Sequence, residues 1–120
     1  MILIFDTDPT EAALLRSALT GMGYAASVVP KSQYGEPLGT LAGNNLMGFP
    51  KGLNKDPVVP VLLFCSMSEE DINNALAGLR QSGLGKNALK AILTPTNQFW
   101  TVAMLAEELR REHQAMQERM

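Results

Sequence analysis

Two carboxylates near the start of the chain, Asp6 and Asp8, are the first groups with the potential to do chemistry. They follow the apolar run Ile2-Leu3-Ile4-Phe5, which is typical of a strand buried on both faces. Carboxylates at a strand end can supply oxygen ligands to a hard cation or accept hydrogen bonds from a polar ligand. Asp8 also precedes Pro9, as an N-cap residue precedes the first residue of a helix. Both interpretations stay open: a structural cap with a strand-end acceptor, or a ligand-binding pair.

Cys65 is the second such group, because it ends another apolar run just before a predicted helix. A helix N-terminus can lower the pKa of a thiol and so produce a nucleophile. An enzyme of this kind also needs a base, and the only histidine, His113, lies far along the chain, where we expect it on the surface. A buried and inert thiol is therefore the expected state of Cys65. One cysteine and one histidine predict no metal site, and no motif predicts a cofactor.

A third polar group joins the last predicted strand to the last predicted helix. It comprises Thr94, Thr96, Asn97 and the aromatic Trp100. Hydroxyl and amide side chains of this kind build tight, side-chain-bonded turns, and Trp100 would anchor such a turn in the core. The same side chains beside a helix N-terminus can bind an anion or a polar ligand. The segment Ser82-Gly83-Leu84-Gly85-Lys86 leaves a helix rather than a strand, so it is a helix stop and not a phosphate loop.

The spacing of apolar residues predicts the elements that position these groups. Strands are expected at residues 2–5, 24–29, 58–65 and 90–93, where the runs are apolar and often β-branched. Helices are expected after the N-cap residues Asp8, Ser68 and Thr101. The region from Pro30 to Pro57 is rich in glycine and proline, which predicts a loop with a short helix near 37–42 and a mobile remainder around 44–55.

This order of elements predicts an α/β fold: a small three-layer α/β/α sandwich with a four-stranded parallel sheet in the order 2-1-3-4. Ligands of open α/β sheets bind outside the carboxyl ends of the strands, where the strand order reverses. If the strands are parallel, their polar ends meet at one edge. The predicted crevice then collects Asp6, Thr7, Asp8, Cys65, Ser66, Thr94 and Asn97.

Composition narrows the class of protein. A chain of 120 residues is expected to form one α/β domain over residues 1–120. Its net charge of −2, without a basic stripe, argues against nucleic acid as a partner. No apolar run approaches the length of a membrane span, and the opening residues lack the features of a signal peptide. A lone cysteine and this opening predict a cytoplasmic protein without a membrane partner.

Two resemblances add to these expectations. The paired acids and the predicted topology resemble a receiver domain, but Cys65 and Ser66 stand where a receiver has its phosphate-accepting aspartate, so phosphotransfer is not expected. The second half of the chain carries the run Lys90-Ala91-Ile92-Leu93-Thr94-Pro95-Thr96-Asn97, followed by Trp100. From Val61 onward the chain resembles the bacterial family catalogued as domain of unknown function 3783. That resemblance implies a small bacterial cytosolic α/β protein and carries over no catalytic residue.

The leading functional hypothesis is a non-catalytic regulatory or protein-interaction module that binds another protein or forms a homodimer. One alternative is a small-ligand or nucleotide binder at the carboxyl ends of the strands. An enzyme that uses Cys65 is a second, less favoured alternative. For the ligand-binding alternative, the candidate residues are Asp6, Asp8, Ser66, Thr94, Thr96, Asn97 and Trp100.

Overall fold

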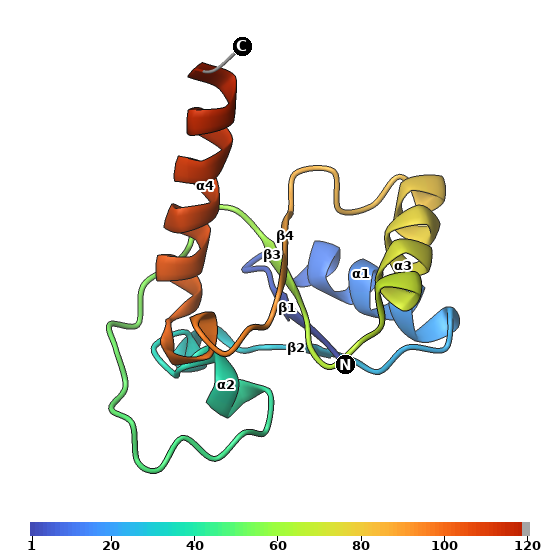
Figure 1. Cartoon of the computed structure of the whole chain (residues 1–120). Helices are drawn as coiled ribbons and strands as arrows, with labels where there is room; N and C mark the ends of the chain where they lie inside the picture. The colour runs from blue at the N-terminus through green and yellow to red at the C-terminus, as the bar shows by residue number, and fades with distance from the viewer. Residues whose placement is uncertain (119–120) are drawn as a thin grey trace.

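β1 (Ile2–Phe5) and β3 (Val61–Phe64) form the centre of one sheet, and every one of their residues is buried. The computed structural model describes residues 1–118, and the side chains of residues 1–112. The edge strands are β2 (Ala26–Val28) and β4 (Leu89–Ile92), which give the predicted order β2-β1-β3-β4. The helices are α1 (Pro9–Gly21), α2 (Leu38–Leu41), α3 (Glu69–Ser82) and α4 (Val102–Glu118), with short 3-10 turns η1 (Lys31–Gln33) and η2 (Asn97–Phe99) (Figure 1).

The prediction of a fully parallel sheet is wrong at its central pair. β1 pairs in parallel with β2, and β3 with β4, but β1 and β3 are antiparallel, with Ile2 opposite Phe64 and Phe5 opposite Val61. The connection between β2 and β3 explains this direction. It starts at the end of β2 and reaches Val61 beside Phe5, at the same edge of the sheet, so the chain never crosses the sheet between them. Such a connection produces an antiparallel pair, whereas a parallel pair needs a crossover.

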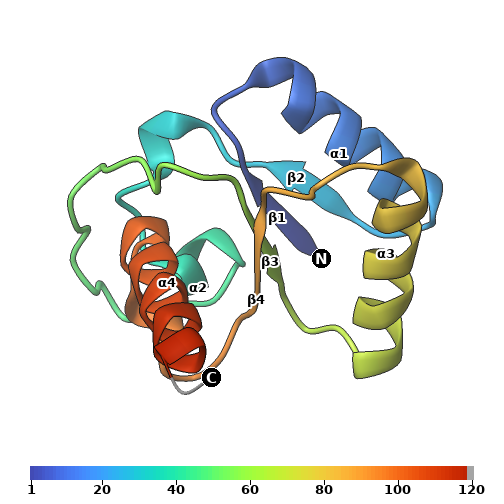
Figure 2. The same cartoon turned by 90° about the horizontal axis from the view of Figure 1, so that it is seen from above.

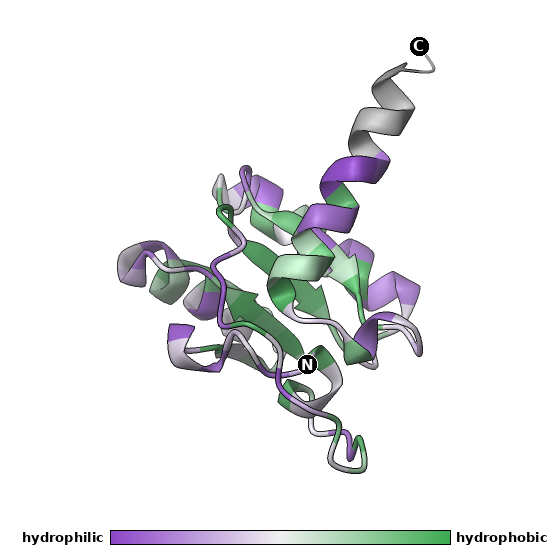
Figure 3. Cartoon of the chain, turned by 90° about the vertical axis from the view of Figure 1, so that its left-hand side faces the viewer, coloured by the Kyte–Doolittle hydropathy of each residue, from purple (hydrophilic) through white to green (hydrophobic). Residues whose placement is uncertain are grey.

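The predicted three layers are present. α1 and α3 cover one face of the sheet, where Ile2, Ile4, Leu62 and Phe64 form a core cluster with residues of both helices (Figure 2). α2 and α4 cover the other face, where the alternate strand residues, such as Leu3 and Leu63, form a second cluster. Figure 3 shows the apolar strands enclosed between helices that carry hydrophilic residues on their surfaces. Successive residues of each central strand are thus buried on opposite faces of the sheet, as the two-residue repeat of a strand requires.

The predicted helix caps are confirmed. Asp8 Oδ1 accepts hydrogen bonds from the backbone N–H groups of Thr10 (3.0 Å) and Glu11 (3.4 Å) at the start of α1. Ser68 Oγ accepts from the N–H of the third residue of α3 at 3.1 Å, and Thr101 Oγ1 accepts from the N–H of Met104 at 3.3 Å. These bonds satisfy N–H groups that have no partner inside the helix.

The glycine- and proline-rich region contains the predicted short helix as α2 and is then held by specific contacts. The N–H of Gly52 donates to the carbonyl of Gly35 at 2.8 Å, and the N–H of Gly35 donates to Asn54 Oδ1 at 2.9 Å. The ring of Phe49 packs against that of Phe99 of η2 in a tilted arrangement, with ring centroids 5.1 Å apart. The loop therefore lies against η2, and Gly52 lies close to the Thr101 side chain at the start of α4.

Two further predictions concern membrane-spanning helices and the position of His113. No helix among the described residues combines the length and the apolar composition that crossing a membrane requires. The predicted surface position of His113 lies outside the residues whose side chains are described.

Candidate functional site

The antiparallel centre of the sheet separates the predicted site residues into two groups. Asp6 and Asp8 follow β1 and lie at the edge where β2 ends and β3 begins. Ser66 and Thr94 follow β3 and β4, which are parallel to each other, and so lie at the opposite edge. The first of these borders at the strand ends is called the Asp6 rim, and the second the Asn97 rim. Both differ from the free edges that run along β2 and β4. The single crevice predicted from seven polar residues does not form, because it required all the strands to point the same way.

Asp6 is a buried carboxylate at the Asp6 rim. Its exposed fraction is only 9%, although its side chain carries a carboxylate. Oδ1 accepts a hydrogen bond from the N–H of Asp8 at 2.9 Å, while Oδ2 is buried without any hydrogen-bond partner. A buried carboxylate oxygen without a partner is unfavourable, because burial removes its hydration and nothing replaces it. Asp6 is therefore a candidate ligand-binding residue, whose Oδ2 would accept a hydrogen bond from the ligand.

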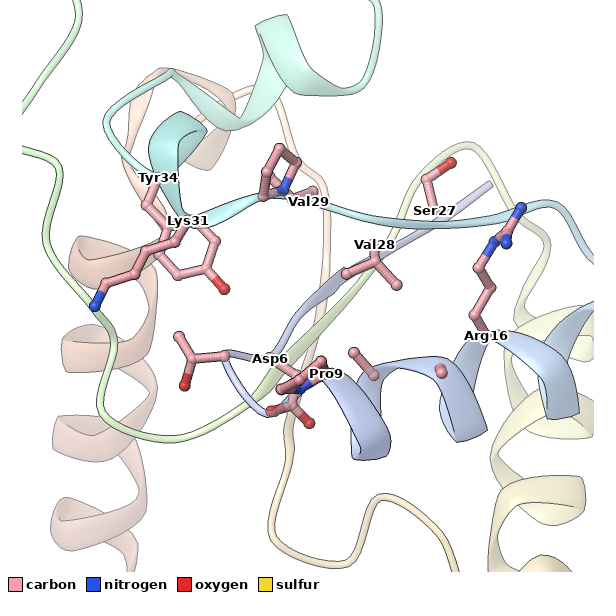
Figure 4. Close-up of a pocket in the computed structure, with 12 residues that line it drawn as sticks. Asp6, Pro9, Arg16, Ser27, Val28, Val29, Lys31 and Tyr34 are labelled. Atoms are coloured by element: carbon pink, nitrogen blue, oxygen red, sulfur yellow. The ribbon is translucent and has the colours of Figure 1, made fainter.

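Two cavities open on either side of Asp6, and it is the one residue their linings share. The Tyr34 pocket, about 550 Å³, lies between α1, β2 and η1 and carries Arg16, Lys31 and Tyr34 (Figure 4). The acidic cavity, about 410 Å³, lies between the start of α1 and the α3–β4 connection. Its lining consists of Asp6, Asp8, Glu11, Leu15, Pro60, Gly83, Gly85, Lys86, Asn87 and Ala88.

Tyr34 belongs to this rim and was not predicted from the sequence. It is 1% exposed, and its ring packs against Phe5 with centroids 5.6 Å apart. Burial, and then the nearby carboxylates of Asp56 and Asp6, raise the pKa of Tyr34 to about 12. The phenol therefore keeps its proton at neutral pH. Tyr34 lies in the glycine- and proline-rich region, where no periodic apolar pattern marks a core residue.

The Asn97 rim contains the predicted side-chain-bonded turn. Asn97 Oδ1 accepts from the N–H of Thr94 at 2.8 Å, and Thr94 Oγ1 accepts from the N–H of Asn97 at 3.0 Å. Asn97 Nδ2 donates to the carbonyl of Ile92 at 2.9 Å. Asn97 is buried, Thr94 and Thr96 are exposed, and Trp100 packs against the core under α4. The amide of Asn97 thus fixes the end of β4 to the turn that follows it.

A groove of about 410 Å³ runs beside this turn, between the free edge of β4 and the surface of α4. We call it the β4 groove. Its apolar part includes Trp100, Leu105 and Leu109, and its acidic part consists of Glu108 and Glu112. The groove also contains Thr94 and Asn97, so three of the predicted site residues lie in one surface feature.

Cys65 and Ser66 follow the end of β3 at the Asn97 rim. Cys65 is 3% exposed, and burial raises the pKa of its thiol to about 11, so little thiolate is present at neutral pH. Ser66 is exposed and lines neither the acidic cavity nor the β4 groove. Among the residues that the structure describes, no three His, Cys, Asp or Glu side chains come together as a metal site.

Residues 60–116 match the model of a family described as Domain of unknown function (DUF3783). The match supports the resemblance seen in the second half of the sequence and includes β3, α3, β4 and η2. No curated protein and no solved structure matches the chain. The whole β4 groove lies inside the matched residues, whereas Asp6 lies before them.

Proposed function

We propose that this chain is a non-catalytic protein-interaction module in which the free edge of β4 pairs with an extended peptide segment of a partner protein. The observation that carries the proposal is the β4 groove, where an unpaired strand edge lies beside an apolar and acidic helix surface. An exposed strand edge presents backbone donors and acceptors to a strand from another chain.

The direction of the β4 backbone groups follows from its pairing with β3. The N–H of Leu89 donates to the carbonyl of Pro60 at 2.8 Å, and that of Leu93 donates to the carbonyl of Phe64 at 2.9 Å. Alternate residues of a strand direct their backbone groups to opposite sides. The backbone groups of Lys90 and Ile92 therefore face the free edge. The side-chain amide of Asn97 already donates to the carbonyl of Ile92. The N–H of Ile92, and the N–H and carbonyl of Lys90, can therefore bond to a partner strand.

The side chains of the groove define the chemistry of the partner. On the α4 face, Trp100 and Leu109 offer apolar contacts, and the carboxylates of Glu108 and Glu112 lie next to them. A lysine or arginine can lay its apolar stem on such a surface and place its charge beside the carboxylates. On the other face, Ile92 is 52% exposed and can contact an apolar side chain. The groove therefore fits a strand in which basic and apolar residues alternate.

A titration with blocked synthetic peptides tests this proposal. The probe is acetyl-Thr-Val-Lys-Val-Lys-Val-Thr-amide, and its charge-reversed counterpart has glutamate in place of lysine. We expect the first peptide to shift the backbone NMR signals of β4 and the first half of α4, and to bind at least about tenfold more tightly than the second, which corresponds to about 1.4 kcal/mol. Equal binding of the two peptides, or shifts away from β4, would contradict the proposal.

A pair of proline variants tests the strand edge at Ile92, where both the backbone N–H and the side chain would meet the peptide. Ile92→Pro removes an N–H that faces the free edge and leaves the bonds to β3 intact. Val28→Pro is the matched control, because Val29 and Ala25 pair with β1 and so place the N–H of Val28 on the opposite edge of the sheet. We expect only Ile92→Pro to abolish peptide binding. Sedimentation velocity completes the test: a dimer that Ile92→Pro dissociates would make a second copy of the chain the occupant and overturn the peptide proposal.

A further inference from the structure

The unpartnered carboxylate of Asp6 points to a second binding site, at the rim opposite the β4 groove. We propose that the acidic cavity binds a small organic ligand through an ammonium group, which donates a hydrogen bond to Asp6 Oδ2. This site is separate from the β4 groove in position and shares no residue with it, so either proposal can fail without the other.

The carboxylate of Asp6 has one oxygen that no group within the described residues satisfies. Its Oδ2 is buried and has no hydrogen-bond partner, while Oδ1 already accepts from the N–H of Asp8. No ion pair within the described part of the chain includes Asp6. The missing partner must therefore be a donor, and a cationic donor also balances the charge that burial leaves unsolvated.

The alternation of side chains along β1 indicates which cavity Asp6 faces. Ile2 and Ile4 belong to the core cluster under α1 and α3, and Asp6 follows them at the same two-residue spacing. The acidic cavity lies on that face, since Leu15 and Ala88 belong to both its lining and the same cluster. In Figure 4 the Asp6 side chain reaches the start of α1 beside Pro9, whereas Tyr34 stands on the other side of the β1–α1 turn.

The charges of the two cavities favour the same assignment. In the acidic cavity three carboxylates, from Asp6, Asp8 and Glu11, face one cation, Lys86. The Tyr34 pocket instead combines Asp6 with the cations Arg16 and Lys31. A recess lined by charges of one sign concentrates the opposite charge, so a cation enters the acidic cavity more favourably. Its volume of about 410 Å³ lies within the range of small-molecule sites.

An ammonium fits the available atoms better than a divalent metal ion. Asp8 Oδ1 caps α1, and Asp6 Oδ1 is bonded to the backbone, so few carboxylate oxygens remain for a cation. Ca²⁺ takes about six or more oxygen ligands, and no three carboxylates among the described residues come together as a metal site. An alkyl ammonium instead needs a few acceptors for its donors and apolar contacts for its carbon chain. Leu15, Pro60 and Ala88 supply those apolar contacts.

An NMR titration of the whole chain with 1,4-diaminobutane tests the proposal, with 1-butanol as a neutral probe of similar length and MgCl2 as a metal probe. We expect saturable shifts of the backbone signals of Asp8, Leu15 and Ala88 with the diamine alone. The absence of saturable shifts overturns the proposal. Saturable shifts of the same signals with Mg²⁺, lost in Asp6→Asn, would make the cavity a metal site and overturn it as well.

Three variants assign the effect to Asp6. Asp6→Asn keeps the size and the acceptor for Asp8 N–H but removes the charge, so we expect binding to weaken at least about tenfold, together with a higher thermal midpoint of the free protein. Glu11→Gln, at the cavity wall, is expected to weaken binding less, and it still tests the cavity if Asp6→Asn does not fold. Asp71→Asn lies in the first turn of α3 at the opposite rim and is the matched control. Equal binding by Asp6→Asn and Asp71→Asn contradicts the assignment.

Discussion

The backbone N–H of Cys65 donates to the carbonyl of Met1 at 2.8 Å, and the nitrogen of Met1 donates to the carbonyl of Cys65 at 3.0 Å. These two bonds place the start of β1 beside the end of β3. They account for the separation of the candidate site residues, because the acids after β1 and the polar turn after β4 then lie at opposite rims. Each rim consequently has its own cavity and its own chemistry.

The first prediction concerns this pairing. Because Met1 and Cys65 form a hydrogen-bonded pair, the pairs Ile2–Phe64 and Ile4–Leu62 are non-hydrogen-bonded pairs, whose Cα atoms approach to about 4.5 Å in antiparallel sheets. We expect strong Hα–Hα cross-peaks between the members of both pairs in a nuclear Overhauser spectrum. The parallel pair Ile4–Val28 is the internal control and should give no comparable peak. A spectrum without the first two peaks would refute the antiparallel centre.

Much of the fold could be predicted from the sequence, but the direction of β3 could not. Asp8, Ser68 and Thr101 mark their helix starts through local chemistry, which acts within a few residues and is therefore visible in the sequence. The runs at β1 and β3 are apolar throughout, as buried central strands are in either direction. Their relative direction depends on where the long connection after β2 ends, and that connection is held by contacts between residues far apart in the sequence, such as Gly35 and Gly52.

The sequence likewise predicted some of the candidate site residues but not how they are grouped in space. Asp6 and Asn97 could be selected by residue type and by their place after a strand, and both are buried polar residues in the structure. Their grouping into one crevice was wrong because it depended on the strand direction. Tyr34 was missed because its ring is buried against Phe5, which is a contact between an irregular segment and a strand. No periodic pattern in the sequence predicts such a contact.

The second prediction concerns Asn97. Its side chain bonds the N–H of Thr94 and the carbonyl of Ile92, and it is 7% exposed. Asn97→Ala leaves both backbone groups without these partners, so we expect the free energy of unfolding to fall by about 2 kcal/mol. Urea denaturation followed by the fluorescence of Trp100 measures the change.

Thr96→Ala is the matched control for Asn97→Ala, because Thr96 belongs to the same turn but is exposed. Its free energy of unfolding should stay within about 0.5 kcal/mol of the parent value. Asn97→Asp adds a second comparison, since a carboxylate accepts from Thr94 but donates nothing to Ile92 when ionised. If Asn97→Ala is as stable as Thr96→Ala, Asn97 does not hold the turn together.

The third prediction concerns the packing of the loop after α2. A Cβ atom at Gly35 would lie 2.8 Å from the carbonyl oxygen of Gly52 and 3.3 Å from the nitrogen of Asn54, both of them backbone atoms. Gly35→Ala must therefore displace the loop, and we expect it to lose about 1–3 kcal/mol of unfolding free energy. Gly21→Ala has no atom within 4 Å of the new methyl group and lies in α1, so it should gain about 0.5 kcal/mol. Equal stability of the two variants would show that the loop does not pack on Gly35.

The last prediction concerns alkaline pH and Cys65. Burial raises the pKa of the thiol from its ordinary value of 9.0 to about 11, so the folded state favours the protonated form. The stability that this preference contributes is complete below pH 9 and is lost as the pH rises through about 11. We therefore expect the unfolding free energy of the parent protein to fall over this interval by more than that of Cys65→Ala.

The comparison with Cys65→Ala removes the contributions of the other groups that titrate in alkali. Tyr34, with its pKa raised to about 12, loses its own contribution as the pH rises from 10.0 toward that value. Burial, and then Arg80, lower the pKa of Lys90, so its contribution has the opposite sign. Both groups are present in parent and variant, and the difference between the two pH profiles therefore reports Cys65 alone. Parallel profiles between pH 9 and 11 would mean that the thiol is not buried in the folded protein.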